Sequence, residues 1–225
     1  CENTITDSSI GINYGVVINE INYNSSVDFN PEDWLELHNP TNETIAMGLW
    51  IFKDDNNNVF TIPENTILSA GDFIVLCKDA VAFESQFPEV TNFIGDLGYG
   101  LGGGGDMVRL FDSNDTLMDE VEYDDEDPWP EQADGEGPTL ELIYPYLDNS
   151  LAENWAASEG YGSPGRENAN NDCDEELGDI NGDSTFDVLD VILMINIILI
   201  LENDYTICQE DASDMNSDGV IDILD

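Results

Sequence analysis

GVVINEINY (15–23) and DWLELHN (33–39) decide the fold of this chain. In both stretches apolar and polar residues alternate, which is the pattern of a β-strand with one buried face. Turn-forming segments such as SAGD and DSND separate them from further runs of similar length. Short strands at this spacing predict an antiparallel β-sandwich rather than an α/β sheet. We expect its other strands at residues 58–62, 72–78, 106–111, 116–123 and 139–143, and one short helix at residues 79–87.

The charge of the chain narrows the classes of partner. Its 225 residues include 50 Asp or Glu and only 4 Lys or Arg, which gives a formal net charge of −46. Because phosphate contacts require Lys or Arg, this composition excludes direct nucleic-acid binding. A surface of this charge repels itself unless cations neutralise it, so divalent metal ions are the expected partners. The longest apolar run, residues 188–201, includes Asp190 and Asn196 and is too short to span a bilayer.

An internal repeat at the C-terminal end carries the strongest functional signal. DINGDSTFDVLD (179–190) and DMNSDGVIDILD (214–225) align position for position. Both place oxygen-bearing side chains at positions 1, 3, 5, 9 and 12 of an EF-hand calcium loop, in which position 7 lends a backbone carbonyl. The sequence therefore predicts two Ca²⁺ sites. The expected ligands are Asp179, Asn181, Asp183, Thr185, Asp187 and Asp190 in the first loop, and Asp214, Asn216, Asp218, Val220, Asp222 and Asp225 in the second.

The two loops differ at position 6, where the chain needs a left-handed turn. Gly219 occupies this position in the second loop and Ser184 in the first. A left-handed serine costs about 1 kcal/mol of backbone strain, so we expect the first site to be the weaker one. The alternative is a pair of acidic turns without metal, which two independent matches over a whole loop disfavour.

An ordered series of motifs runs through the β-rich part. VVINEINYN is followed by DWLELHNPTNETIAM, LSAGDFIVL, a Gly-rich turn before DMVRLFD, and NWAASEGYGSPGREN. This series resembles the lamin-tail domain over residues 13–168. The resemblance implies an immunoglobulin-like β-sandwich without catalytic residues, of the kind found in nuclear lamins and attached to secreted bacterial proteins.

The two loops resemble the type I dockerin family. Asp at position 12 and the D-x-N-x-D spacing carry this resemblance over residues 177–225, and it implies calcium binding and docking to cohesins. Cellulosomal dockerins usually carry Ser or Thr at positions 10 and 11, whereas this chain has Val-Leu and Ile-Leu there, which argues against a cellulosomal cohesin. The second repeat ends at its last ligand, so we expect a longer natural chain. The expected order is an N-terminal segment (1–12), a β-sandwich (13–168), a linker (169–176) and a small α-helical, dockerin-like module (177–225).

The helix expected after the first loop is apolar on nearly every side. A helix at a protein surface usually shows one apolar stripe, so this helix must be covered on more than one side. One interpretation is burial within the chain, and the other is a docking face for a second protein. The candidate interface residues are Val188, Leu189, Ile192, Leu193, Ile223 and Leu224.

The cysteines bear on the location of the protein. Cys173 and Cys208 bracket the first loop and its helix, so we expect them as a candidate disulfide pair, which would indicate an oxidising, extracytoplasmic compartment. Cys1 and Cys77 form a weaker second pair. Cys1 is a candidate lipid anchor of a bacterial lipoprotein, or simply an arbitrary first residue. We expect an extracellular or cell-surface protein, of bacterial origin.

Other polar clusters favour structural roles. The acidic segments at residues 54–58 and 124–127 are expected to be solvated loops rather than further calcium sites. The single histidine, His38, follows a strand and favours a turn or capping role. The glycines at 102–105 lack the Lys and the helix of a phosphate-binding loop, and no nucleophile has a recognisable base beside it. Nothing in the sequence supports enzymatic activity.

Three functional hypotheses remain. The first is a structural protein that associates with itself or with neighbours through the calcium-ordered module. The second is an attachment module that docks a larger polypeptide onto a cohesin-like receptor. The third is an accessory region of a secreted hydrolase whose catalytic part lies outside this sequence.

Overall fold

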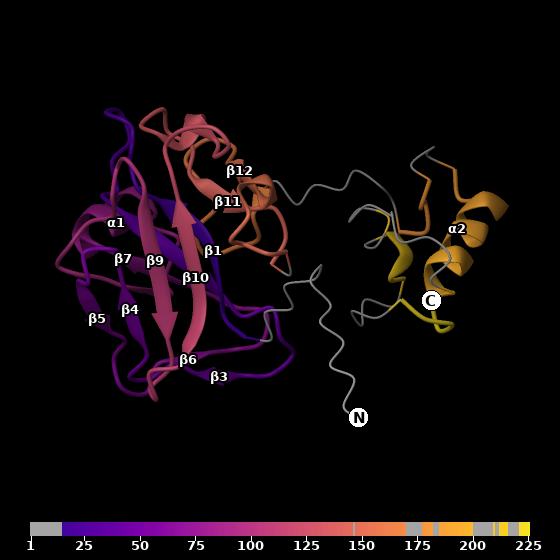
Figure 1. The fold of residues 1–225 in the computed structure, drawn as a ribbon, viewed down its shortest axis with the longest axis horizontal. Coiled ribbons are helices and arrows are strands. Elements are labelled where there is room, and N and C mark those ends of the chain that lie inside the picture. Colours follow the sequence, from indigo (N-terminus) through magenta and orange to yellow (C-terminus); the bar gives the residue numbers. More distant parts are fainter. Residues whose placement is uncertain are drawn as a thin grey trace, which may run out of the picture. The chain divides into compact units, whose positions relative to one another are not determined.

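The computed structural model describes residues 15–145, 147–169, 177–181, 185–199, 209, 212–215 and 221–225. The chain divides into two compact units, residues 1–171 and residues 172–225 (Figure 1).

The first unit is an immunoglobulin-like β-sandwich. A six-stranded sheet has the order β12-β11-β1-β2-β7-β8, a four-stranded sheet has the order β10-β9-β4-β5, and β3 pairs with β6. In Figure 1 the long strands β9 and β10 lie in front of β1 and β7. The strands are β1 Val17–Asn22, β2 Trp34–His38, β3 Ile45–Ala46, β4 Ile51–Lys53, β5 Val59–Thr61, β6 Ile67–Leu68, β7 Phe73–Cys77, β8 Phe93–Ile94, β9 Asp106–Phe111, β10 Leu117–Tyr123, β11 Leu140–Leu142 and β12 Trp155–Ala157.

The predicted elements of this unit are confirmed, and the shortest strands were missed. Each stretch predicted as a strand contains one, and the predicted helix is α1, Ala80–Gln86, whose N-terminus is capped by Asp79. The strands β3, β6 and β8 are two residues long, too short to show a period. The strands β4 and β12 were also missed. One pairing departs from the predicted antiparallel pattern, because β7 and β8 run parallel.

The main core lies between the six-stranded and four-stranded sheets. Leu35 and Leu37 from β2 pack there with Phe52 from β4 and Leu110 from β9, all fully buried. Opposing sheets of this kind are stabilised by interdigitating side chains from their two inner faces. The alternation predicted for β2 therefore places its leucines in the core, as expected.

The prediction that β1 and β2 are half-buried is wrong. Every residue of both strands is buried, including Glu20 and Glu36. The outer face of the sheet is covered in two places: Trp34 packs against Phe83 of α1, with ring centroids 5.8 Å apart, and residues 158–168 bind the glutamates. The alternation of apolar and polar residues correctly identified the two faces of these strands. It could not show that segments distant in the sequence cover the polar face.

A buried asparagine ties two loops of this unit together. The fully buried Asn39 side chain donates to the carbonyl oxygens of Glu43 (2.8 Å) and Ser69 (2.8 Å). Its Oδ1 accepts from the Thr41 hydroxyl at 2.7 Å. A buried polar group left without its partner costs about 1–3 kcal/mol.

We expect Asn39→Ala to lower the free energy of unfolding of the β-sandwich by about 2 kcal/mol, since it removes the hydrogen bonds of a fully buried amide, including the bond to the buried carbonyl oxygen of Leu68 (3.2 Å). Urea denaturation followed by tryptophan fluorescence measures this change. Asn114→Ala, in an exposed turn, is the control and should change stability by less than about 0.5 kcal/mol. An equal effect of both substitutions would contradict the role of Asn39.

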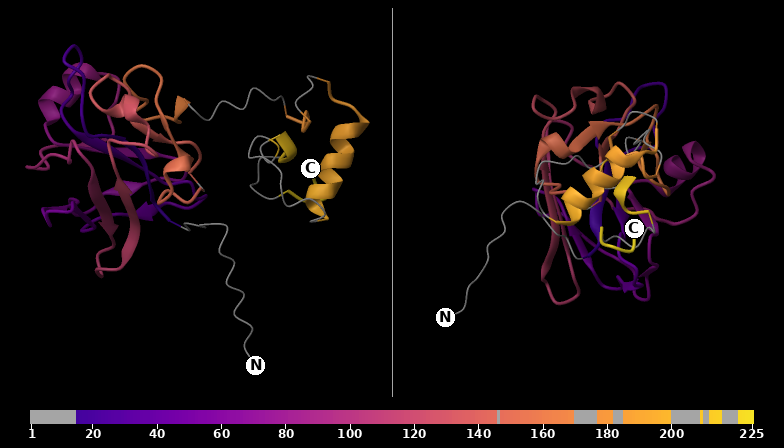
Figure 2. Two further views of the ribbon diagram at one scale, coloured as in Figure 1. Left: turned by 45° about the horizontal axis from the view of Figure 1, so that its top comes forward. Right: turned by 90° about the vertical axis from the view of Figure 1, so that its right-hand side faces the viewer.

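The second unit contains α2, Val188–Ile198, drawn in orange in both views of Figure 2. This helix begins at the tenth position of the first predicted calcium loop, so the last ligand of the loop lies in its first turn, as the sequence predicts. A small apolar cluster joins its buried side to the rest of the unit. The members of this cluster are Ile180, Leu193, Met194, Ile197, Ala212 and Ile221.

Candidate metal centre and docking face

The first predicted loop is closed by the carboxylate at its last position. Asp190 is fully buried, and its Oδ1 accepts from the backbone N–H of Asn181 at 3.1 Å. Its Oδ2 accepts from the backbone N–H of Asp187 at 2.8 Å. Positions 3, 9 and 12 of the loop are thereby drawn together. These N–H groups, that of Asp187 foremost, hold the pKa of Asp190 below its usual range.

The same contacts begin the helix. Asp187 is the N-cap of α2 and accepts from the Leu189 N–H at 2.7 Å, which forms a capping box with Asp190. A capping box satisfies two of the N–H groups that a helix leaves unpaired at its start. The residues predicted to bind calcium therefore also fix where α2 begins.

The second loop repeats this geometry. Asp222 N–H donates to Asp225 Oδ2 at 2.8 Å, and Leu224 N–H donates to Asp222 Oδ1 at 2.7 Å. These two bonds join the same loop positions, with the same lengths, as those at Asp187 and Asp190. The alignment of the two sequences is thus matched by a structural repeat at positions 9 to 12.

The described ligands account for part of each predicted site. Asp179 is buried and Thr185 is exposed, and Asp214 is described in the second loop. The predicted ligands Asp183, Asn216, Asp218 and Val220 lie outside the described residues. Among the residues that are described, no three His, Cys, Asp or Glu side chains gather closely enough to hold a metal ion. The donors present are hard oxygens, which suit Ca²⁺.

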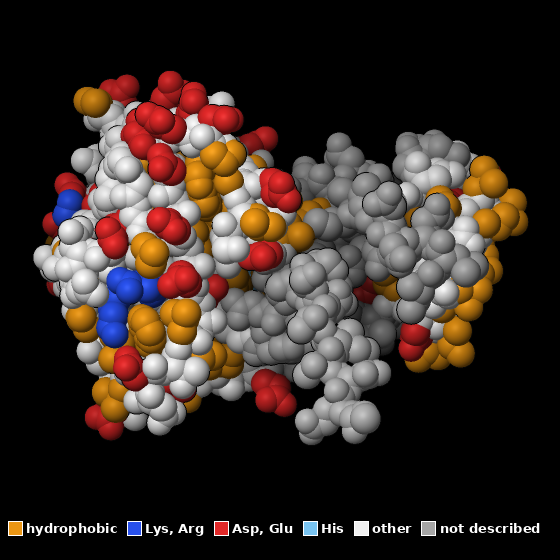
Figure 3. Space-filling view, in the orientation of Figure 1, with side chains coloured by type: hydrophobic (Ala, Val, Ile, Leu, Met, Phe, Trp, Pro, Cys, Tyr) orange, Lys and Arg blue, Asp and Glu red, His pale blue; other side chains and the backbone are white. Residues whose placement is uncertain are grey.

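An exposed apolar face accompanies both loops. Five of the six predicted interface residues are exposed, with Ile223 at 87% and Val188 at 66%, whereas Leu193 packs in the small apolar cluster. Along α2 only Asp190 and Ile197 are buried. Figure 3 shows hydrophobic side chains gathered at the surface over this helix. The expectation that α2 is covered on more than one side is therefore not met within the described part of the chain.

The cysteine predictions fall largely outside the described residues. Cys1, Cys173 and Cys208 all do so, and nothing in the comparisons supports a lipid anchor at Cys1. Cys77, on β7, is a buried free thiol, so its predicted pairing with Cys1 is wrong. Burial raises the pKa of the Cys77 thiol to about 12. In the described parts of the chain, no helix has the length and apolar character needed to cross a membrane.

The first acidic segment outside the repeat, at residues 54–58, has a structural role. Asp54, only 1% exposed, accepts from the Asn58 N–H at 2.7 Å and from the Asn58 side chain at 2.6 Å. These bonds close the turn between β4 and β5. Arg109 donates to the backbone oxygen of Asp54.

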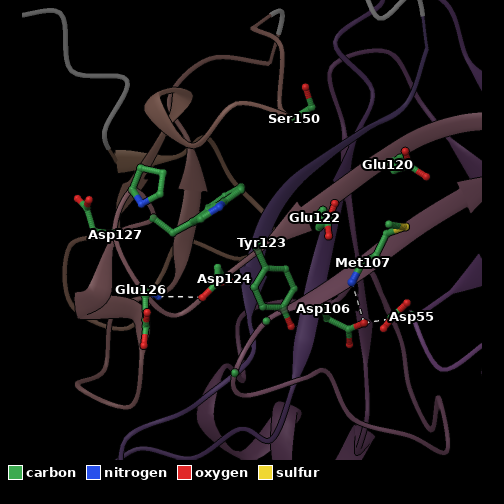
Figure 4. Close-up of a pocket in the computed structure, with 14 residues that line it drawn as sticks. Asp55, Asp106, Met107, Glu120, Glu122, Tyr123, Asp124, Glu126, Asp127 and Ser150 are labelled. Atoms are coloured by element: carbon green, nitrogen blue, oxygen red, sulfur yellow. Dashed lines mark hydrogen bonds between the residues drawn. The ribbon is translucent and has the colours of Figure 1, made fainter.

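The second acidic segment, at residues 124–127, contributes to the lining of a cavity of about 600 Å³ (Figure 4). Asp106 accepts there from the backbone N–H groups of Asp55 (2.9 Å) and Met107 (2.8 Å). Asp124 accepts from the Glu126 N–H at 3.1 Å. The side chains around the cavity include Asp55, Asp106, Met107, Glu120, Glu122, Tyr123, Asp124, Glu126, Asp127, Trp129 and Ser150.

His38 has a packing role at the end of β2. Its ring stacks on Phe73 with centroids 4.1 Å apart, and Nδ1 lies 3.3 Å from the backbone oxygen of Asp72. Burial lowers the pKa of His38 to about 4, so the ring is neutral near pH 7.

An immunoglobulin-like sandwich followed by a repeated acidic loop defines a chain of linked, non-catalytic module types. Residues 13–125 match the Lamin Tail Domain, and the chain belongs to this family. Residues 177–225 match the Dockerin type I domain, a calcium-binding module that docks to other proteins and is typically extracellular and bacterial. Both resemblances stated from the sequence are thereby confirmed, in the predicted order. A search of curated proteins finds no match.

Sequence reasoning missed one group of polar residues. Glu20, Glu36 and Glu141 are fully buried in neighbouring strands of the six-stranded sheet. The signal that could have found them is the matching position of Glu in the two leading strands, together with the polar NWAASEGYGSPGREN segment that covers them.

Proposed function

We propose that this chain is a secreted or cell-surface assembly protein without catalytic activity, whose C-terminal unit associates with other protein chains when it binds calcium. The observation that carries this proposal is the pair of exposed apolar dipeptides, Val188-Leu189 and Ile223-Leu224, at equivalent places after the two repeated loops. Large apolar side chains gathered on an exposed face mark sites of protein association.

Calcium would be held by the oxygen ligands of the two loops. Asp179, Asp187 and Asp190 belong to the first ligand set, and Asp214, Asp222 and Asp225 to the second. Bound Ca²⁺ neutralises carboxylates that otherwise repel one another, and so fixes each loop against its following turn. Because Asp187 also caps α2, ion binding and presentation of the apolar face are coupled through one residue.

We expect calcium to convert the chain from a monomer to a larger assembly, and Val188→Ser with Leu189→Thr to weaken this association about 100-fold. The reason is that burial of each such side chain contributes about 1.5–3 kcal/mol, and about 1.4 kcal/mol corresponds to tenfold in affinity. Sedimentation velocity with calcium and with a chelator measures the assembly.

The control is Val27→Ser, which alters a fully exposed valine of the β-sandwich unit and should leave the assembly unchanged. Calcium binding to the Val188→Ser, Leu189→Thr protein should also be unchanged, because both side chains lie at loop positions that supply no ligand. A chain that is monomeric with and without calcium contradicts self-association.

The match to the Dockerin type I domain favours a second candidate, attachment to a cohesin-like receptor. The apolar dipeptides occupy the loop positions at which cellulosomal dockerins carry Ser or Thr, so the receptor would have a complementary apolar surface. A monomer that binds such a receptor only in calcium would support this candidate over self-association.

A further inference from the structure

Three buried glutamates face one another on the outer side of the six-stranded sheet. Glu20 of β1 lies directly opposite Glu36 of β2 and directly opposite Glu141 of β11. Side chains at directly opposed positions of antiparallel strands project from the same face. All three residues are fully buried, and like charges at such positions destabilise a sheet.

One segment covers this cluster and bonds to every member of it. We call residues 158–168 the strap. The Ser163 N–H donates to Glu20 Oε1 at 3.0 Å, and the Ser163 hydroxyl donates to Glu141 Oε1 at 2.7 Å. The Gly165 N–H donates to Glu36 Oε2 at 2.5 Å. The strap is thus fastened to three strands through their carboxyl groups.

Two asparagines and a glycine also hold the strap on the sheet. Asn168 donates to the backbone oxygens of Asn19 (3.0 Å) and Leu142 (2.8 Å), and Asn19 donates to Glu36 Oε1 at 3.0 Å. Gly162 has a φ of +93°, and a Cβ there would collide with Glu20 Oε1. The strap backbone therefore approaches the carboxyl group more closely than any other residue type permits.

We propose that Glu20, Glu36 and Glu141 form a proton-dependent latch, which holds the strap on the sheet when they share protons and releases it when they are ionised. The charged groups that act on Glu20 are Glu36 and Glu141, and Glu141 acts on Glu36. The hydrogen bonds described above, together with that from the Thr139 hydroxyl to Glu20, come from uncharged hydroxyl, amide and backbone groups. Arg166 and Glu167 of the strap are exposed. With no basic side chain among these partners, protons must relieve the repulsion.

The pKa values of Glu20 and Glu36 are raised, which is the direction that a proton-dependent latch requires. Burial raises the pKa of Glu20 well above its ordinary value, and the charges of Glu36 and Glu141 raise it further. Burial raises the pKa of Glu36 to about 8, against the opposing effect of the Gly165 and Asn19 donors. A carboxyl group with a higher pKa in the closed state takes up a proton on closing. Closure is therefore favoured at low pH and is lost as the pH rises from the ordinary Glu range towards about 8.

Release of the strap would lengthen the connection between the two units. The strap ends at Asn168, and the second compact unit begins at residue 172. Opening would add about 11 residues to this connection, which at roughly 3.3 Å per extended residue is about 35 Å. The latch thus makes the length of the connection depend on pH.

Hydrogen exchange of the full chain tests the latch directly. Peptides that cover the strap report opening through the amides of Ser163 and Gly165, which donate to the cluster. After correction for the intrinsic pH dependence of exchange, we expect the opening constant to rise by up to about tenfold per pH unit between pH 6 and pH 8, for each proton released. Gly162→Ala, which obstructs closure, should exchange rapidly at both pH values.

Glu20→Gln is the decisive variant. The amide oxygen can keep the bonds from Thr139 (2.5 Å) and Ser163, while the substitution removes the central charge. We expect it to remove the share of one proton, up to about tenfold per pH unit, from the pH dependence of strap exchange, and to leave the share that belongs to Glu36. Glu167→Gln, an exposed carboxyl of the strap, is the matched control and should behave as the unaltered chain.

Two results would overturn the latch. One is strap exchange in the unaltered chain that does not vary with pH after correction, or that varies equally in the Glu20→Gln protein. The other is closure of the strap at pH 8 by added calcium in the unaltered chain and not in Glu20→Gln, which would make a bound cation, rather than shared protons, the element that holds the cluster.

Discussion

Removing calcium is expected to unfold residues 177–225 and to leave the β-sandwich folded. In the described part of the second unit one small apolar cluster packs against α2, which spans Val188–Ile198. Isolated helices of this length are marginal in water. A ligand present at about 100 times its dissociation constant stabilises the folded state by about 2.7 kcal/mol per site. Two sites would thus supply stability comparable to that of a small domain.

Circular dichroism measures this loss as a drop in the helical signal on addition of chelator, reversed by excess calcium. Tryptophan fluorescence reports the other unit, because all four tryptophans lie in it. Asp190→Ala removes the carboxylate that closes the first loop. It should weaken calcium binding at that loop at least about tenfold, which corresponds to a loss of about 1.4 kcal/mol of binding free energy. Asp28→Asn, an exposed residue of the sandwich, is the control. A helical signal indifferent to chelation contradicts this account.

Trp34→Ala is expected to destabilise the β-sandwich by about 3–5 kcal/mol. Trp34 is fully buried on β2, where it meets Phe83 and Phe87 with ring centroids 5.8 and 5.9 Å away. Truncation removes this burial and leaves a cavity between the sheet and α1, and such losses have this magnitude. The substitution should lower the melting temperature of the unit by about 10 °C, since 1 kcal/mol corresponds to about 2–4 °C in a domain of this size.

Differential scanning calorimetry provides the measurement. Val81→Ala, on the exposed side of α1, should shift the transition by about 1 °C or less. A shift as small for Trp34→Ala would show that α1 does not cover the sheet. The calcium-dependent signal of the second unit should be the same in both variants, because each unit has its own core.

The sequence predicted the sandwich because its longer strands follow a regular alternation. The strands β9 and β10 alternate in burial along most of their length, as an exposed outer face requires. Strands of two residues leave no such pattern, and β3 and β6 are of this kind. The pairing of these segments depends on turns and on contacts between distant residues, which alternation does not encode.

The calcium loops could be predicted from the sequence, whereas the glutamate cluster could not. The loops were predictable because their donors fall within one short segment, whose spacing reflects a turn around an ion. The cluster joins Glu20 to Ser163, which lies far along the chain, so no local pattern reveals it. Glu20 and Glu36 sit at polar positions of alternating strands, which predicts exposure. Only the strap, folded back across these positions, makes them buried.

Native mass spectrometry of the intact chain tests the central claim most directly, because it counts bound ions. With millimolar calcium we expect two Ca²⁺ per chain. Asp179→Ala and Asp214→Ala, each at the first position of one loop, should each reduce the number to one. A chain that carries no calcium under these conditions would contradict the assignment of the repeated loops, and with it the proposed function.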